Sequence, residues 1–316
     1  MPTLTPESSS AKAPVQADAA GRLAVPAVAR AGASLWRDAW RRLLRNRAAV
    51  FGAVVIAFLI AICLATPYLA PYSDEEQDFA AQFQPPSAKH LFGTDIKGRD
   101  LLTRVMYGGR ISLAVGVVAT FVSMLIGIAW GSVAGYVGGR TDEVMMRIVD
   151  ILYSIPFIFF VILLMLYLGR SLVNIFLALG AVQWLTMSRI VRGQILSLKH
   201  KEFVEASRAL GAGPARVLTS HLIPNLLGPV IVYATLTVPM VMLEEAFLSF
   251  LGLGVQAPRT SWGSLAADGA ANINPVRIYW WLIVFPGMAL AATLFSLNFL
   301  GDGLRDALDP QLKDKA

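Results

Sequence analysis

The sequence predicts an all-α, polytopic membrane protein with six transmembrane helices. Hydrophobic residues make up 56% of the 316-residue chain and charged residues only 15%, whereas a soluble domain carries about 25% charged residues. Six uncharged runs are each long enough to cross ~30 Å of hydrocarbon. Lysine and arginine are also unevenly shared among the segments between these runs, as expected for membrane proteins.

The fourth of these runs is the shortest, and we expect it to extend beyond its C-terminal end, where Arg189 and Arg192 can reach the lipid headgroups. The predicted spans are residues 48–70, 111–137, 151–169, 171–188, 222–243 and 278–301.

Six spans place both termini on one side of the membrane, and the basic residues predict which side. If the N-terminus is inside, the inner segments hold 19 of the 27 lysines and arginines. The sequence therefore predicts an N-in, C-in protein. Segment 71–110 is then extracytoplasmic, and segment 189–225 is a cytoplasmic loop. Lys97 and Arg99 in the outer segment oppose this assignment, but six carboxylates balance its basic residues.

The N-terminal part of the chain precedes the membrane domain, which we place at residues 48–312. Residues 1–33 are rich in Ala, Ser and Pro and predict a disordered cytoplasmic tail. Residues 34–47 predict a basic amphipathic helix, capped by Ser34, on the membrane surface; a recognition helix for a partner is the alternative. Residues 313–316 form a short C-terminal tail.

The sequence also excludes several kinds of chemistry. The single cysteine, Cys63, allows no internal disulfide, and the three histidines lack metal-ligand spacing. The net charge of +6 comes with no nucleic-acid-binding motif and fits basic inner loops of a membrane protein. No P-loop or hydrolase motif occurs, so we expect a non-enzymatic chain without its own cofactor or metal.

Residues 201–225 form a polar segment that predicts helix, tight turn, helix. Phe203, Ala206 and Leu210 are spaced to share one face of the first helix. Gly211 suits a left-handed stop, and Pro214 suits the first turn of the next helix. We expect neither helix to have many more than ~12 residues, which makes both marginal without a docking partner.

Several residues inside the runs are unusual for a lipid environment. Gly127, Gly131 and Gly135 form small-xxx-small steps that favour close helix packing rather than a gate. Pro156, Pro239 and Pro286 predict kinks or breaks. Glu244 and Glu245 lie near the outer end of the fifth run, where at most one can face the bundle interior. An interfacial carboxylate and a contact with a cavity or another subunit both remain open for them.

The 201–225 segment resembles the EAA loop of ATP-binding-cassette (ABC) importer permeases. Glu205-Ala-Ser-x-x-x-Gly211, nine residues and His221-Leu-Ile-Pro224 match its Glu-Ala-Ala, Gly and Pro spacing, with departures at Ser207, His221 and Ile223. The ending His221-Leu-Ile-Pro-Asn225 is similar to that of the oligopeptide and dipeptide branch. Three further stretches, at residues 90–113, 248–254 and 301–310, look like the C-type permease subunit of that branch.

This resemblance implies the type I importer transmembrane fold in a bacterial inner membrane. A homologous B-type permease would form the other half of the pathway, and an extracytoplasmic binding protein would deliver peptide. Two ATPase subunits would carry ATP and Mg²⁺. The EAA loop would dock on one ATPase, with a coupling role for Phe203, Glu205, Ala206, Ser207, Leu210, Gly211 and Pro214, and with His221 and Pro224 ending the loop.

Other functions remain as alternatives. The same branch also handles nickel, glutathione and other solutes, and the sequence does not choose among these substrates. An ion-driven secondary transporter would show inverted repeats and midplane carboxylates, which this chain lacks. A membrane-embedded enzyme would need facing ionisable groups within the spans, and they are almost absent.

Overall fold

The computed structural model describes residues 35–169, 171–274 and 276–308, and the elements in these ranges are helical. The long helices are α2 (Arg47–Leu69), α3 (Leu101–Val137), α6 (Leu172–Leu198), α9 (Ile223–Phe250) and α11 (Trp281–Leu308). The shorter helices are α1 (Leu35–Arg45), α4 (Gly139–Tyr153), α5 (Phe157–Leu168), α7 (Glu202–Ala209), α8 (Pro214–Arg216) and α10 (Trp262–Ala271). The predicted tails at 1–33 and 313–316 and the predicted cap Ser34 lie outside the described residues.

Five helices in the described ranges are long and apolar enough to cross a membrane, and a bent pair of helices gives a sixth candidate span when the two are taken together. The predicted third span at 151–169 is interrupted at Pro156, where the sequence predicted a kink or break. Helices α4 and α5 meet at an angle of 92°. Pro156 lies at this break and caps α5 with extended backbone, since it has no N–H to continue the helix.

Several of the long helices extend beyond the uncharged runs. Helix α6 continues to Leu198, which confirms the predicted extension past Arg189 and Arg192. Helix α3 starts at Leu101, well before the predicted 111, because the Asp100 side chain accepts a hydrogen bond from the Thr103 backbone N–H at 2.8 Å. Charged residues therefore lie in the first turns of a helix that goes on to span.

The amphipathic segment before the first span is a separate helix. Asn46 ends α1 and starts α2, because its Oδ1 accepts hydrogen bonds from the backbone N–H groups of Ala48 and Ala49. Ala39 is buried on one side of α1, while Trp40 and Leu44 are exposed. The predicted helix is therefore present, and its position on the membrane surface stays a prediction.

Helices α3 and α6 pack closely along their length, as the small-residue steps predicted. A methyl group added at Gly127 or Gly131 would collide with Met187 or with the Ser188 carbonyl oxygen of α6. At Gly135 it would lie 3.0 Å from the Ile195 Cβ. The glycines thus permit backbone contact between the two helices, which is the packing role rather than a gate.

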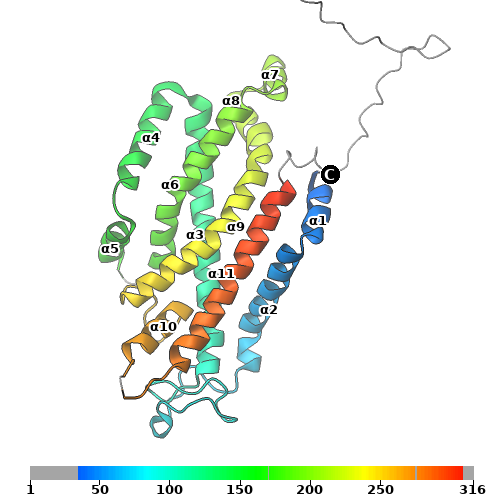
Figure 1. The fold of residues 1–316 in the computed structure, drawn as a ribbon. Coiled ribbons are helices and arrows are strands. Elements are labelled where there is room, and N and C mark those ends of the chain that lie inside the picture. Colours follow the sequence, from blue (N-terminus) through cyan, green and yellow to red (C-terminus); the bar gives the residue numbers. More distant parts are fainter. Residues whose placement is uncertain (1–34, 170, 275, 309–316) are drawn as a thin grey trace, which may run out of the picture.

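Figure 1 shows the long helices side by side, with two distinct ends to the bundle. One end, called the α7 end here, carries α1, α7 and the C-terminal end of α11. The opposite end, called the far end, carries residues 70–100, α10 and the beginning of α11. The first and last described helices therefore have their outer termini at the same end, as expected for an even number of crossings.

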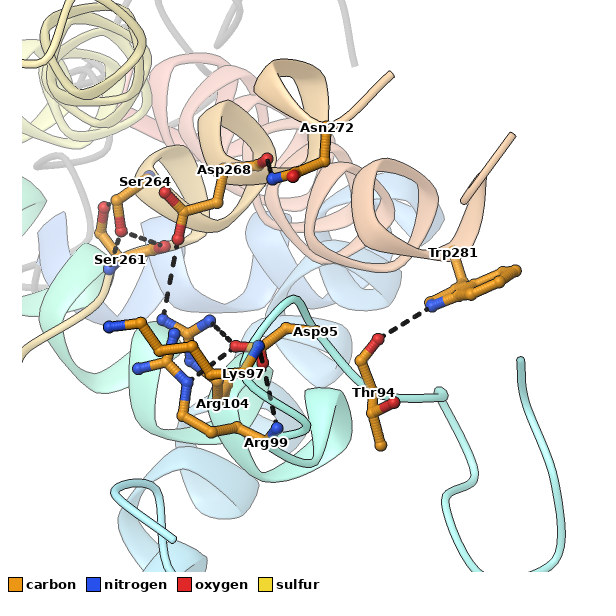
Figure 2. A network of polar contacts seen from close by, with 10 residues as sticks. All are labelled: Thr94, Asp95, Lys97, Arg99, Arg104, Ser261, Ser264, Asp268, Asn272 and Trp281. Carbon is orange, nitrogen blue, oxygen red and sulfur yellow. Dashed lines mark hydrogen bonds and ion pairs between the residues drawn. The ribbon is translucent and has the colours of Figure 1, made fainter. Parts of the chain in front are cut away.

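A buried ionic network organises the far end (Figure 2). Arg104 of α3 is 3% exposed and donates to Asp95 at 2.6 Å. Arg99 donates to the same carboxylate at 2.8 Å, and Asp268 of α10 lies 3.8 Å from Arg104. Because the charges are paired, the network can hold the 70–100 segment against α3 and α10 despite its burial. Nothing in the sequence pattern predicted this network.

Candidate functional site

The best-defined surface feature at the α7 end is the turn between α7 and α8. The Leu210 N–H donates to the Ala206 carbonyl at 3.0 Å, and the Gly211 N–H to the Arg208 carbonyl at 2.9 Å. Gly211 then adopts φ +85°, and the space around its missing Cβ is open. A side chain would therefore fit sterically at Gly211, but the left-handed backbone would disfavour it.

Pro214 starts the next helix, as its sequence position predicted. The prediction that this helix is short is wrong. Residues 214–250 form one 37-residue helical element that reaches deep into the bundle. A π-helical turn at Val217–Leu222 interrupts its regular hydrogen bonding without breaking the element. Displacement at Pro214 would therefore be carried into the spanning part of α9.

The end of the predicted loop is this π-helical turn. His221 is half-buried in it, and its carbonyl accepts a hydrogen bond from the Asn225 side chain at 2.6 Å. Pro224 lies just after the π-helical turn and has no N–H to donate to the helical hydrogen bonds. His221 and Pro224 therefore lie where the π-helical turn passes into α9.

Only one side chain of α7 is fully buried. Val204 is 0% exposed and belongs to a cluster with Val217 and Leu222 from the following turn and with Val191 and Ile195 of α6. Val204 anchors α7 on the bundle, and the sequence pattern does not single it out. Its signal was weak, because the apolar residues of so short a helix do not show which of them is buried.

The predicted coupling residues lie on the exposed side of α7. Phe203 is 41% exposed and Leu210 is 89% exposed. Glu205 and Ala206 are exposed, and Ser207 is half-buried. Glu205 forms no ion pair with any residue that the structure describes. Phe203, Leu210 and Glu205 are thus exposed at the surface. The helix that carries them is anchored on the bundle by Val204.

The two glutamates in α9 have different surroundings. Glu245 is 1% exposed, and its Oε1 accepts hydrogen bonds from Ser249 at 2.6 Å and Ser261 at 2.7 Å. It ties the end of α9 to the start of α10, which the sequence could not show. Glu244 is half-buried, and its Oε1 accepts from Gln183 of α6 at 2.7 Å.

The fold defines a multi-pass membrane protein with one exposed helical turn at the end of a long helix. Residues 127–314 match the family model "Binding-protein-dependent transport system inner membrane component". Residues 34–86 match "N-terminal TM domain of oligopeptide transport permease C". The first model describes an inner-membrane component of a transport system, and the second describes the N-terminal transmembrane domain of a transport permease.

Curated relatives agree with these models over most of the chain. The oligopeptide transport system permease protein OppC of Haemophilus influenzae is 51% identical over 282 residues, 89% of this chain and 90% of its own. The dipeptide transport system permease protein DppC of Bacillus subtilis is 48% identical, covering 90% of this chain and 89% of its own. OppC of Escherichia coli K12 is 50% identical over 89% of this chain and 92% of its own.

The chain therefore belongs to the inner-membrane permeases of binding-protein-dependent ABC transport systems, which confirms the resemblance found in its sequence. A solved structure of the MetNI methionine ABC transporter in inward-facing conformations shares the fold. The TM-score is 0.55 at 20% identity, over 66% of this chain and 98% of the other.

Proposed function

We propose that this chain forms half of the translocation pathway of an ABC importer for peptides and receives the work of ATP hydrolysis through α7. The observation that carries this proposal is the exposed turn: Phe203 and Leu210 face outward, while Val204 anchors the helix and Gly211 sets its angle. The names of the OppC and DppC relatives support peptides as the substrate. Nickel and glutathione are the alternative substrates.

The partners follow from this role. A homologous B-type permease completes the pathway, two ATPase subunits hold ATP and Mg²⁺, and a binding protein delivers peptide. The chain itself is non-catalytic and lies N-in, C-in, so that α7 faces the cytoplasm. Burial of Phe203 and Leu210 on an ATPase would stabilise the contact by a few kcal/mol, and Glu205 can pair with a basic residue there.

Movement passes from the ATPase to the pathway through a short mechanical connection. Closure of the ATPases around ATP pushes α7, and the left-handed Gly211 holds α7 at a fixed angle to the next helix. Because 214–250 is one helical element, the push shifts α9 relative to α6. The pathway between the two permeases then opens to the other side.

Reconstitution tests the proposal. Proteoliposomes that contain the assembled transporter should take up tripeptide when ATP and binding protein are present on their correct sides, without any ion gradient. The purified chain alone should hydrolyse no ATP. Uptake that follows an ion gradient without ATP would indicate a secondary transporter, and uptake of Ni²⁺ or glutathione but not peptide would overturn the substrate assignment.

A further inference from the structure

A cavity of about 410 Å³ lies beside the break between α4 and α5. Its wall is formed by that bent pair, by α6 and by α9, and Glu244 is among its lining residues. The bend at Pro156 leaves this space, since a straight helix would continue past it. The cavity is separate from the α7 turn.

Glu244 is held in one orientation with half of its carboxylate unused. Gln183 donates from Nε2 to the Glu244 Oε1 at 2.7 Å. The Glu244 Oε2 is buried and has no hydrogen-bond partner among the described residues. A buried carboxylate oxygen without a donor costs free energy. A hydrogen-bond donor in the cavity would complete the arrangement.

The rest of the cavity favours a positively charged donor. Four aromatic residues line it, Tyr153, Phe157, Phe160 and Tyr233, and none of the described lining residues is Lys, Arg or His. A carboxylate among aromatic faces attracts a cation both by charge and by cation–π interaction. Arg189 stacks on Tyr153 at 4.4 Å, but its guanidinium is paired with Asp150 at 2.8 Å.

We propose that this cavity binds the primary ammonium group at the amino terminus of a transported peptide, with Glu244 Oε2 as its acceptor and Gln183 as the positioning residue. An ammonium supplies three N–H donors, and a peptide's amino terminus carries one such group. The inference rests on the proposed peptide function and specifies where the membrane subunit recognises its substrate.

Cysteine protection measures this binding without transport. Met240 also lines the cavity and lies one turn before Glu244. The only native cysteine, Cys63, is buried. In the assembled transporter carrying Met240→Cys, without ATP or binding protein, maleimide labelling of this chain is followed with trialanine or N-acetyl-trialanine present. We expect trialanine to protect the cysteine at about tenfold lower concentration than N-acetyl-trialanine does. Acetylation removes the charged amino group and with it the hydrogen bond to Glu244.

Two variants in the same background identify the acceptor. Glu244→Gln should make the two peptides protect equally, because the glutamine side chain keeps the shape of the glutamate and removes its charge. Glu143→Gln, on an exposed position of α4, should keep the difference. Three results would overturn the proposed binding site. In the parent, these are equal protection by both peptides or no protection by either. The third is a difference between the peptides that persists in Glu244→Gln.

An uptake measurement separates this inference from the proposed function. With ATP and binding protein, Glu244→Gln should lower the initial rate of trialanine uptake about tenfold, and Glu143→Gln should not. If the parent transporter takes up no peptide, the peptide function fails even if amine-dependent protection is seen. If it takes up peptide and Glu244→Gln has no effect on uptake or protection, only the site fails.

Discussion

At the scale of single residues, Gly211 is a position where backbone conformation rather than packing restricts the side chain. It adopts φ +85°, and nothing lies within 4 Å of the place that a Cβ would occupy. Gly213 is equally open but has φ −69°, an ordinary value for any residue. The two glycines thus separate the effect of backbone conformation from the effect of added bulk.

We expect Gly211→Val to leave the protein inserted and folded but to abolish transport. The left-handed conformation costs a non-glycine residue about 1–2 kcal/mol, and more when it is β-branched, so the turn would open and α7 would lose its angle. The measurement is peptide uptake at matched protein levels in the membrane. Gly213→Val is the control and should transport normally; wild-type uptake by Gly211→Val would remove the coupling role of the turn.

Charge at Glu205 should govern the contact with the ATPase. Glu205 is exposed and has no described ion-pair partner, so reversing its charge should cost this chain little stability. Glu205→Lys should reduce co-purification of the ATPase, because a basic partner would be repelled. Glu143→Lys makes the same change on α4 and should not. Unchanged co-purification would mean that Glu205 serves only its own helix.

The sequence predicted the residues of this turn whose roles are local. Gly211 and Pro214 act through their own backbone geometry, and their positions in the structure agree with the prediction. Val204 was missed because its burial depends on α6 and α9, which the chain places elsewhere in sequence. The Ser261 partner of Glu245 and the Gln183 partner of Glu244 were missed for the same reason, whereas Ser249 lies only four residues after Glu245 on α9.

At the scale of elements, the contact between α3 and α6 depends on the absence of side chains. Gly131 faces the Ser188 carbonyl and lies against Val191. We expect Gly131→Ala to destabilise the protein by about 1–3 kcal/mol through overpacking against backbone. Thermal unfolding followed by size-exclusion chromatography measures it. Gly193→Ala on α6, where a methyl group meets open space, should be neutral or stabilising; equal effects would argue against close packing.

The ionic network at the far end should hold its elements together. Arg104→Met should cost about 2 kcal/mol, since Asp95 loses a charged hydrogen bond but keeps Arg99 as a partner. Lys97→Ala is the matched control, because the Lys97 side chain is exposed. Faster proteolysis of the 70–100 segment in Arg104→Met but not in Lys97→Ala would show the effect. Identical proteolysis of both variants would contradict it.

Elements were predicted well where hydrophobicity alone defines them and poorly where helices bend. The uncharged runs located five spanning helices, but a run records only length and polarity. It could not show that α4 and α5 meet at 92°, although Pro156 marked the place. The start of α3 was missed because buried ion pairing of Arg104 makes charged residues tolerable in its first turns.

At the scale of the whole molecule, one helical element joins the exposed α7 turn to the cavity that Glu244 lines inside the bundle. The α7 turn stands at one extremity of the 37-residue element 214–250, and Glu244 lies near the other. In the proposed mechanism, the ATPases move the α7 turn, and the peptide binds at Glu244. In that mechanism, a chain without a nucleotide-binding motif would use ATP that its partners hydrolyse.

The measurement that tests this account most directly is site-specific cross-linking from position 210 in the assembled transporter. Leu210 is 89% exposed on the turn, so a photoreactive amino acid placed there should yield an adduct with an ATPase subunit. The same amino acid at Tyr68, which is 90% exposed in the last turn of α2, should not. An adduct with lipid or binding protein at position 210, and none with an ATPase, would contradict the account.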